Sequence, residues 1–117
     1  MSYANAARLG ADGQPDPTFR PNPMGGGATE IALDTDGSIL LAGAFFGFQP
    51  DGAATGTSRE LLARVGNDGT LDTSFYPKPN QQVPALGLDL DGRVIVGGAF
   101  TGFLPNGTTV TVPRKAF

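Results

Sequence analysis

Short apolar runs separated by turn residues recur along this chain. Ile39–Ala42 is continuous and apolar, and Val94–Val96 is its counterpart; each follows an Asp-Gly turn. A run this short between turns is typical of a strand buried on both faces. A further strand is expected ahead of each turn, over Thr29–Leu33 and Ala85–Leu88. No stretch carries an apolar stripe at helical spacing over three turns, so the pattern predicts an all-β chain.

The same order of residues occurs twice. Ala7–Phe19 and Ala63–Phe75 both read A-R-(L/V)-G-x-D-G-x-x-D-x-(T/S)-F and lie 56 residues apart. Asp34–Phe48 and Asp89–Phe103 share a second pattern at an offset of 55 residues. A fixed period of this size indicates a repeat architecture. We therefore treat residues 1–117 as a single two-repeat segment, with one repeat at about 7–62 and the next at about 63–117.

Each A-R-(L/V)-G run leads into a predicted hairpin. Residues 11–13 and 67–69 fit a three-residue loop, a type I turn closed by glycine at positive φ. This register places an arginine opposite an aspartate in each copy, Arg8 with Asp16 and Arg64 with Asp72. Such cross-strand charge pairs contribute roughly 0.2–1 kcal/mol. We predict a structural role for both pairs, with a functional arginine–aspartate site as the alternative.

A phenylalanine ends each hairpin and a proline-rich link follows it. Phe19 and Phe75 are expected to anchor the hairpins in the core. The links are Arg20–Met24 and Tyr76–Asn80. Because proline cannot donate to a sheet ladder, we predict that these links are connectors and not central strands.

Each unit holds about four short strands in roughly 55 residues, which fits a β-propeller blade. Arg114 aligns with Arg59, and the continuation after Arg59 has its other copy at Ala7–Leu9, so the chain begins late in one unit and ends early in another. A propeller needs about four to eight blades. We predict two four-stranded blades per chain, in a ring closed by homo-oligomerisation. The alternative is a two-blade fragment of a longer array.

Ring closure is expected to share one blade between chains, with residues 1–19 of a neighbouring chain completing the last blade. A trimer is favoured, and a tetramer is next, because six to eight blades avoid the tight curvature of four.

The composition narrows the range of functions. The net charge is −3 with no cluster of Lys or Arg, so the electrostatic footprint of nucleic-acid binding is missing. The chain has no cysteine and no histidine, which removes thiol chemistry and the commonest general base and metal ligand. No apolar run reaches the length of a membrane span, and no signal peptide is evident at the N-terminus.

The two patterns together, ARLxxDGxxDxxF and DxDGxILxxGxF, resemble the bacterial delta-60 repeat family of propeller blades. The matching residues are Ala63–Phe75 and Asp91–Phe100, and in the first copy Pro15 and Pro17 replace Leu71 and Thr73. The resemblance implies a module of large bacterial surface or secreted proteins, and hence an extracellular or cell-surface location. It carries no catalytic motif. Long arrays are usual in that family, whereas this chain has two repeats.

Acidic residues are the first candidates for chemistry. Asp34-x-Asp36 and Asp89-x-Asp91 match the start of a calcium loop, but Phe45 and Phe100 stand where the bidentate Glu is required. We therefore expect hairpin turns, no metal and no cofactor. Most other acids also lie in Asp-Gly turns, and no carboxylate pair repeats between the copies, so no catalytic residue and no enzyme activity are expected.

Aromatic residues are the remaining candidates. Phe45, Phe46, Phe48, Phe100 and Phe103 either line a ligand groove or form the core between blades. Two functions stay open: a structural and interaction module that partners with itself, and a carbohydrate-binding propeller with one glycan pocket per blade. For the second, the candidate ligand-binding residues are Phe46, Phe48, Asp51, Phe103 and Asn106.

Overall fold

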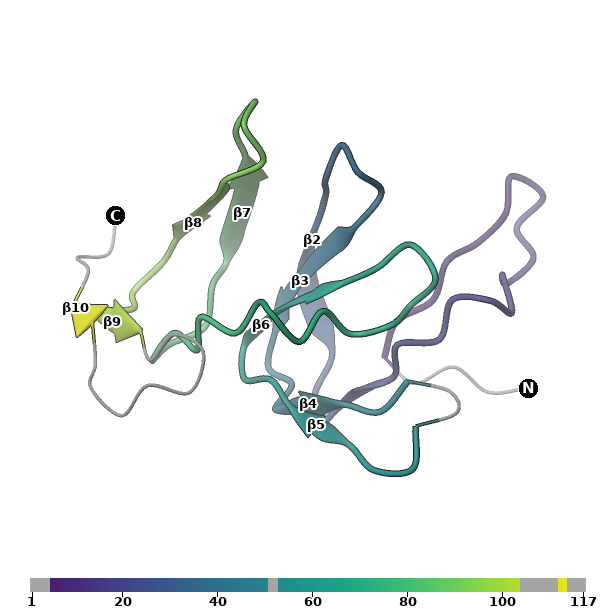
Figure 1. The fold of residues 1–117 in the computed structure, drawn as a ribbon, viewed down its shortest axis with the longest axis horizontal. Helices are drawn as coiled ribbons and strands as arrows, with labels where there is room; N and C mark the ends of the chain where they lie inside the picture. The colour runs from purple at the N-terminus through teal and green to yellow at the C-terminus, as the bar shows by residue number, and fades with distance from the viewer. Residues whose placement is uncertain (1–4, 51–52, 104–111, 114–117) are drawn as a thin grey trace.

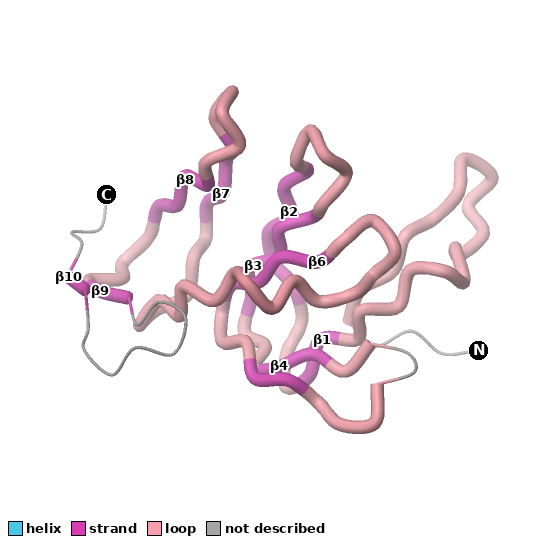
Figure 2. The backbone as a smooth tube through the Cα atoms, viewed as in Figure 1, coloured by secondary structure: helices cyan, strands magenta, loops and turns pink. Residues whose placement is uncertain are grey.

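The computed structural model describes residues 5–50, 53–103 and 112–113. These residues form strands, turns and loops, and no helix occurs among them (Figure 2). All strand pairs are antiparallel. The strands are β1 (Pro23–Met24), β2 (Ala28–Leu33), β3 (Ile39–Gly43), β4 (Gly47–Phe48), β5 (Thr57–Ser58), β6 (Leu62–Val65), β7 (Ala85–Leu88), β8 (Val94–Gly97), β9 (Gly102–Phe103) and β10 (Val112–Pro113).

The main sheet has the order β2-β3-β6, with the apolar strand β3 in its centre. Every residue of β3 is buried, as its continuous apolar sequence predicts. Its register pairs Ile31 with Leu41 on one side and Leu41 with Ala63 on the other. A bridge between Val65 and Leu71 adds the return of the next hairpin. The sheet therefore has three strands and a one-residue bridge where we predicted four strands.

A smaller sheet, β1-β4-β5, lies beside the end of the main sheet (Figure 1). Here Pro23 pairs with Phe48, and β1 is the edge strand. The first proline-rich link thus contains no central strand, as predicted, but its last two residues form an edge strand and are not only a connector. Proline is tolerated there because an edge strand leaves one side of its backbone without ladder bonds. The pair β9–β10 is the counterpart of β4–β5 in the second unit.

The four Asp-Gly hairpins in the described residues use the same loop. A glycine at positive φ closes each loop and donates back to a carbonyl three residues earlier. The glycines are Gly13, Gly37, Gly69 and Gly92, with φ angles of 84°, 90°, 86° and 78°. In the first hairpin Gly10 N donates to Gln14 O at 2.8 Å, and Asp16 N donates to Arg8 O at 2.8 Å. The predicted three-residue loop and its register are confirmed.

The two units stack through equivalent strands. β2 and β7 lie side by side, and β8 lies on the far side of β7 (Figure 1). Two apolar clusters cover the two faces of β3. The first cluster consists of Phe19, Ile39, Leu41, Phe45, Phe48, Ala63 and Val65. The second cluster joins the units and consists of Ala42, Leu62, Val83 and Phe100, with Phe75, Leu86, Val96 and Phe103 against them.

The second unit departs from the expectation of a strand buried on both faces. In β8 the side chain of Ile95 is 56% exposed, although its counterpart Leu40 in β3 is fully buried. The second unit covers the face of β3 that carries Leu40 and Ala42, whereas the described residues place no further unit against the matching face of β8.

Candidate functional site

The two predicted arginine–aspartate pairs are present in the structure. Arg8 Nε donates to Asp16 Oδ2 at 3.0 Å, and Arg64 Nε donates to Asp72 Oδ2 at 2.8 Å. Each guanidinium also lies over the phenylalanine that ends its hairpin, Arg8 at 4.7 Å from the Phe19 ring and Arg64 at 4.6 Å from the Phe75 ring. Carboxylate and aromatic ring hold each arginine against its own hairpin, which supports the structural interpretation. Arg8 Nη1 also donates to Asn67 Oδ1 of the other hairpin at 2.9 Å.

The aspartates of these hairpins are held in their charged form. The Ser74 hydroxyl donates to Asp72 Oδ1 at 2.6 Å and lowers the pKa of Asp72. The Thr18 hydroxyl lowers the pKa of Asp16 in the same way. A general acid needs a carboxyl that keeps its proton near neutral pH, and hydrogen bonds to the carboxylate act in the opposite direction.

The turn aspartates show the same effect. The Ser38 hydroxyl lowers the pKa of Asp36, the Thr70 hydroxyl lowers that of Asp68, and the Arg93 backbone N–H lowers that of Asp89. In the described part of the chain, no group of three acidic or other metal-ligating side chains comes together. The described residues also contain no helix long and apolar enough to cross a membrane.

The aromatic candidates lie in different environments. Phe46 is 57% exposed, as its exchange for threonine in the second unit predicts. Phe48 is fully buried, with its ring 4.8 Å from that of Phe45 in an edge-to-face arrangement. Its ring offers no surface to a ligand, which corrects its selection as a binding residue. The physical reason is that the first core cluster encloses it. Asp51 and Asn106 lie outside the described residues.

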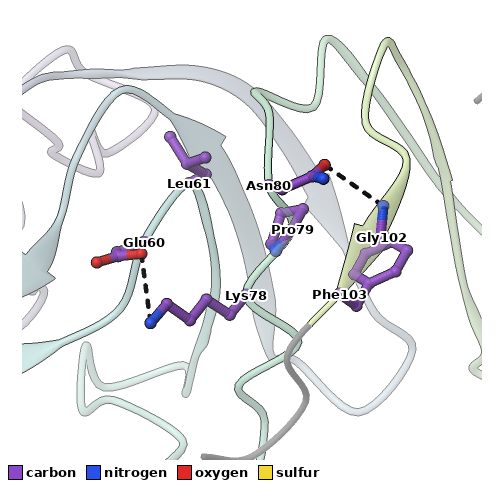
Figure 3. Close-up of a pocket in the computed structure, with 7 residues that line it drawn as sticks. All are labelled: Glu60, Leu61, Lys78, Pro79, Asn80, Gly102 and Phe103. Atoms are coloured by element: carbon purple, nitrogen blue, oxygen red, sulfur yellow. Dashed lines mark hydrogen bonds and ion pairs between the residues drawn. The ribbon is translucent and has the colours of Figure 1, made fainter. Parts of the chain in front are cut away.

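Phe103 is half-buried and lines a pocket of about 250 Å³, which we call the inter-unit pocket. Three segments build it, as Figure 3 shows. The connection from β5 to β6 supplies Glu60 and Leu61, the second proline-rich link supplies Lys78, Pro79 and Asn80, and β9 supplies Gly102 and Phe103. The pocket therefore combines an aromatic ring with a few charged and polar groups, which is typical of small-molecule sites.

Polar groups of the inter-unit pocket are fixed to different degrees. Asn80 Oδ1 accepts the Thr101 N–H at 2.9 Å and the Gly102 N–H at 3.4 Å, so the amide is held against β9. Lys78 Nζ and Glu60 Oε2 are 3.8 Å apart, and both side chains are partly exposed. An exposed ion pair of this length contributes little to stability, so both groups are available to a ligand.

Two residues of the pocket have an unfavourable backbone conformation. Leu61 has a φ of 70° and Lys78 a φ of 48°, in the left-handed region that side chains with a Cβ rarely adopt. Such strain often lies at binding sites. Here, however, their counterparts Asn5 and Asn22 have φ angles of 61° and 52°. The conformation thus belongs to the repeated backbone and is no evidence for a ligand by itself.

The positions equivalent to this pocket in the first unit make different contacts. Asn5 Nδ2 donates to Pro23 O at 3.0 Å, and the Met24 side chain lies against Gly47 and Gly56. Asn80 and Leu61 replace Met24 and Asn5 in the second unit. Sequence reasoning did not select Glu60, Lys78 or Asn80. The signal in the sequence that could have indicated the pocket was the replacement of Met24 by Asn80 between otherwise similar links.

The fold defines an all-β protein of repeated, antiparallel units. Residues 35–75 match the model of a family described as a domain of unknown function (DUF5122) that forms a β-propeller. The match spans β3 to the end of the second hairpin, about a third of the chain, and supports a propeller-repeat family. No curated protein and no solved structure matches the chain.

Proposed function

We propose that this chain is a non-enzymatic β-propeller module with a structural and interaction role, which builds its ring from copies of itself. The stacking of two equivalent units through β2 and β7 carries the proposal. Propeller blades are arranged around a central channel, and two units leave the ring open. The lowered pKa of the hairpin aspartates argues against a general acid among them.

The number of chains in the ring follows from the number of blades that each chain supplies. With two units per chain, a trimer supplies six blades and a tetramer eight, and we favour the trimer. Residues 1–19 complete the last blade of the neighbouring chain. The delta-60 repeat family, with its surface and secreted proteins, is the class that this module resembles.

Absolute mass in solution tests the proposal. Light scattering of the full chain should give three times the chain mass of 12.0 kDa, or four times in a tetramer. A folded, stable species of a single chain mass would contradict it.

A carbohydrate-binding role is the second candidate, and the inter-unit pocket favours it. Phe103 offers a ring face on which the apolar face of a sugar can stack, and Glu60, Lys78 and Asn80 offer partners for hydroxyl groups. A glycan array tests this role. We expect binding that Phe103→Ala removes and Phe46→Ala keeps, because Phe46 is exposed outside the pocket. No bound glycan, or equal loss in both variants, argues against it.

A further inference from the structure

Among the described residues, the sheet edge formed by β8 lacks the neighbouring strand that its counterpart β3 has. In the first unit β3 is hydrogen-bonded to β2 on one side and to β6 on the other. In the second unit β8 is hydrogen-bonded to β7, and the described residues place no strand on its other edge. An unpaired edge of this kind is a template for another strand.

In the N-terminal hairpin, the described residues leave the edge of a β6-like strand without a β3-like neighbour. Ala7–Leu9 is the sequence counterpart of Ala63–Val65 in β6, and Leu9 bridges Pro15 as Val65 bridges Leu71. β6 has β3 along its other edge, whereas the described residues place no strand along the corresponding edge of Ala7–Leu9. Among the described residues, β8 therefore lacks a β6-like neighbour, and the N-terminal hairpin lacks a β3-like neighbour.

Exposed apolar side chains lie where the first unit has no neighbouring unit among the described residues. Leu86 and Val96 pack into the second core cluster, which joins the two units. Their counterparts are Ile31 and Leu41, which face the N-terminal hairpin. There Ile31 is 60% exposed and Leu33 is 72% exposed. Both border a hollow of about 260 Å³, lined by Ala6, Ala7, Arg8, Phe19, Ile31, Leu33, Ile39 and Leu41.

Between the two units of one chain, the space that corresponds to this hollow is occupied. Ala42 of β3 and Leu62 of β6 fill the interface to the second unit. At the N-terminal hairpin, the part of the chain that the structure describes places no β3-like strand in that position. Within the described ranges, β8 is the β3-like strand with an unpaired edge. Ile95, which is 56% exposed, shares a sheet face with the counterpart of Ala42.

We propose that β8 of one copy pairs with Ala7–Leu9 of a second copy. This inference rests on the proposed function and specifies its interface. The register repeats that of β3 with β6, so Val94 faces Leu9, Ile95 faces Arg8 and Val96 faces Ala7. Ile95 of the first copy then covers Ile31 and Leu33 of the second. The contact is head-to-tail, and it generates a ring where the rotation closes.

Engineered cysteines test the register, because the chain has no cysteine of its own. Leu9→Cys with Val94→Cys places the two thiols at facing positions, at a separation that a disulfide can bridge. β8 and the N-terminal hairpin lie at opposite ends of the chain (Figure 1), so the bond joins two copies. We expect covalent multimers on a non-reducing denaturing gel, lost on addition of reductant.

The matched control is Leu9→Cys with Ile95→Cys, which moves one thiol by one residue and hence to the other sheet face. We expect at least tenfold less cross-linking from the control. Equal cross-linking by both pairs, or none by the first pair in protein that light scattering shows to be oligomeric, overturns this interface and leaves the proposed function standing. A monomeric wild-type chain overturns both.

A second variant reports on the interface without cysteines. Ile95→Lys puts a positive charge opposite Arg8 and against Ile31 and Leu33 of the next copy, and should reduce the assembled mass to that of one chain. Leu90→Lys is the control, because Leu90 is fully exposed in a turn. An unchanged mass for Ile95→Lys, or the same loss for Leu90→Lys, contradicts the proposed pairing.

Discussion

Asn22 and Lys78 share one left-handed backbone conformation, with φ angles of 52° and 48°. Each precedes a proline that pairs with a phenylalanine, Pro23 with Phe48 and Pro79 with Phe103. The repeat thus preserves the left-handed conformation although asparagine, which tolerates it, is replaced by lysine, which adopts it only at a cost. Asparagine enters the left-handed region at lower cost than most other residues with a Cβ.

Leu61 offers a direct test of this cost. Leu61→Asn restores the residue found at Asn5, its counterpart in the first unit, and should raise the free energy of unfolding by roughly 1 kcal/mol. Urea denaturation followed by circular dichroism measures the change. Leu62→Asn is the control, because Leu62 is buried and its replacement by a polar residue should lower the free energy of unfolding. Lower stability in Leu61→Asn would contradict the strain argument.

The Arg64–Asp72 pair should couple modestly. A double-mutant cycle with Arg64→Ala and Asp72→Ala is expected to give a coupling free energy of about 0.2–1 kcal/mol. The pair between Arg93 and Asp91 is the control, with side chains that are 73% and 75% exposed, and should couple less. Zero coupling for Arg64 and Asp72 would show that their contact contributes nothing to stability.

Acid should weaken the fold through the hairpin aspartates. Hydrogen bonds from Ser74 lower the pKa of Asp72 in the folded chain. A lowered folded-state pKa stabilises the fold above the unfolded value of about 3.9, and this contribution is lost as the pH falls through the folded value. Asp72→Asn should therefore be less stable than wild type at pH 6, with a gap that narrows below about pH 4. A gap independent of pH would refute this.

The two neighbouring phenylalanines of the first unit should differ in their effect on stability. Phe48→Ala empties a fully buried position and should cost about 3–5 kcal/mol. Phe46→Ala removes a ring that is 57% exposed, and its effect should stay within about 0.5 kcal/mol. Thermal melts followed by circular dichroism compare the two variants. Equal losses would mean that Phe46 also belongs to the core.

Calcium should leave the melting temperature unchanged. The turn carboxylates already accept backbone N–H groups, as Asp36 Oδ1 does from Ser38 N at 2.9 Å and Asp68 Oδ1 does from Thr70 N at 3.1 Å. Melts with calcium and with a chelator provide the comparison. A rise of several degrees that only calcium produces would require a metal site at these turns.

The sequence by itself determined the local structure. Asp-Gly at the end of a short loop is enough to specify the turn, because only glycine adopts the required positive φ without strain. That loop sets which residues face each other, so the pairs of Arg8 and Arg64 followed from spacing alone. The repeat also indicated the strands, since β3 and β8 differ little in sequence.

Tertiary structure decided which of two equivalent residues is buried. Phe48 and Phe103 occupy equivalent positions, yet the first is enclosed and the second lines a pocket. Leu40 and Ile95 differ in the same way. Burial depends on what the neighbouring unit places against a residue, and period and polarity along one chain do not contain that information. The inter-unit pocket is assembled from three separate segments, so the sequence could not predict it for the same reason.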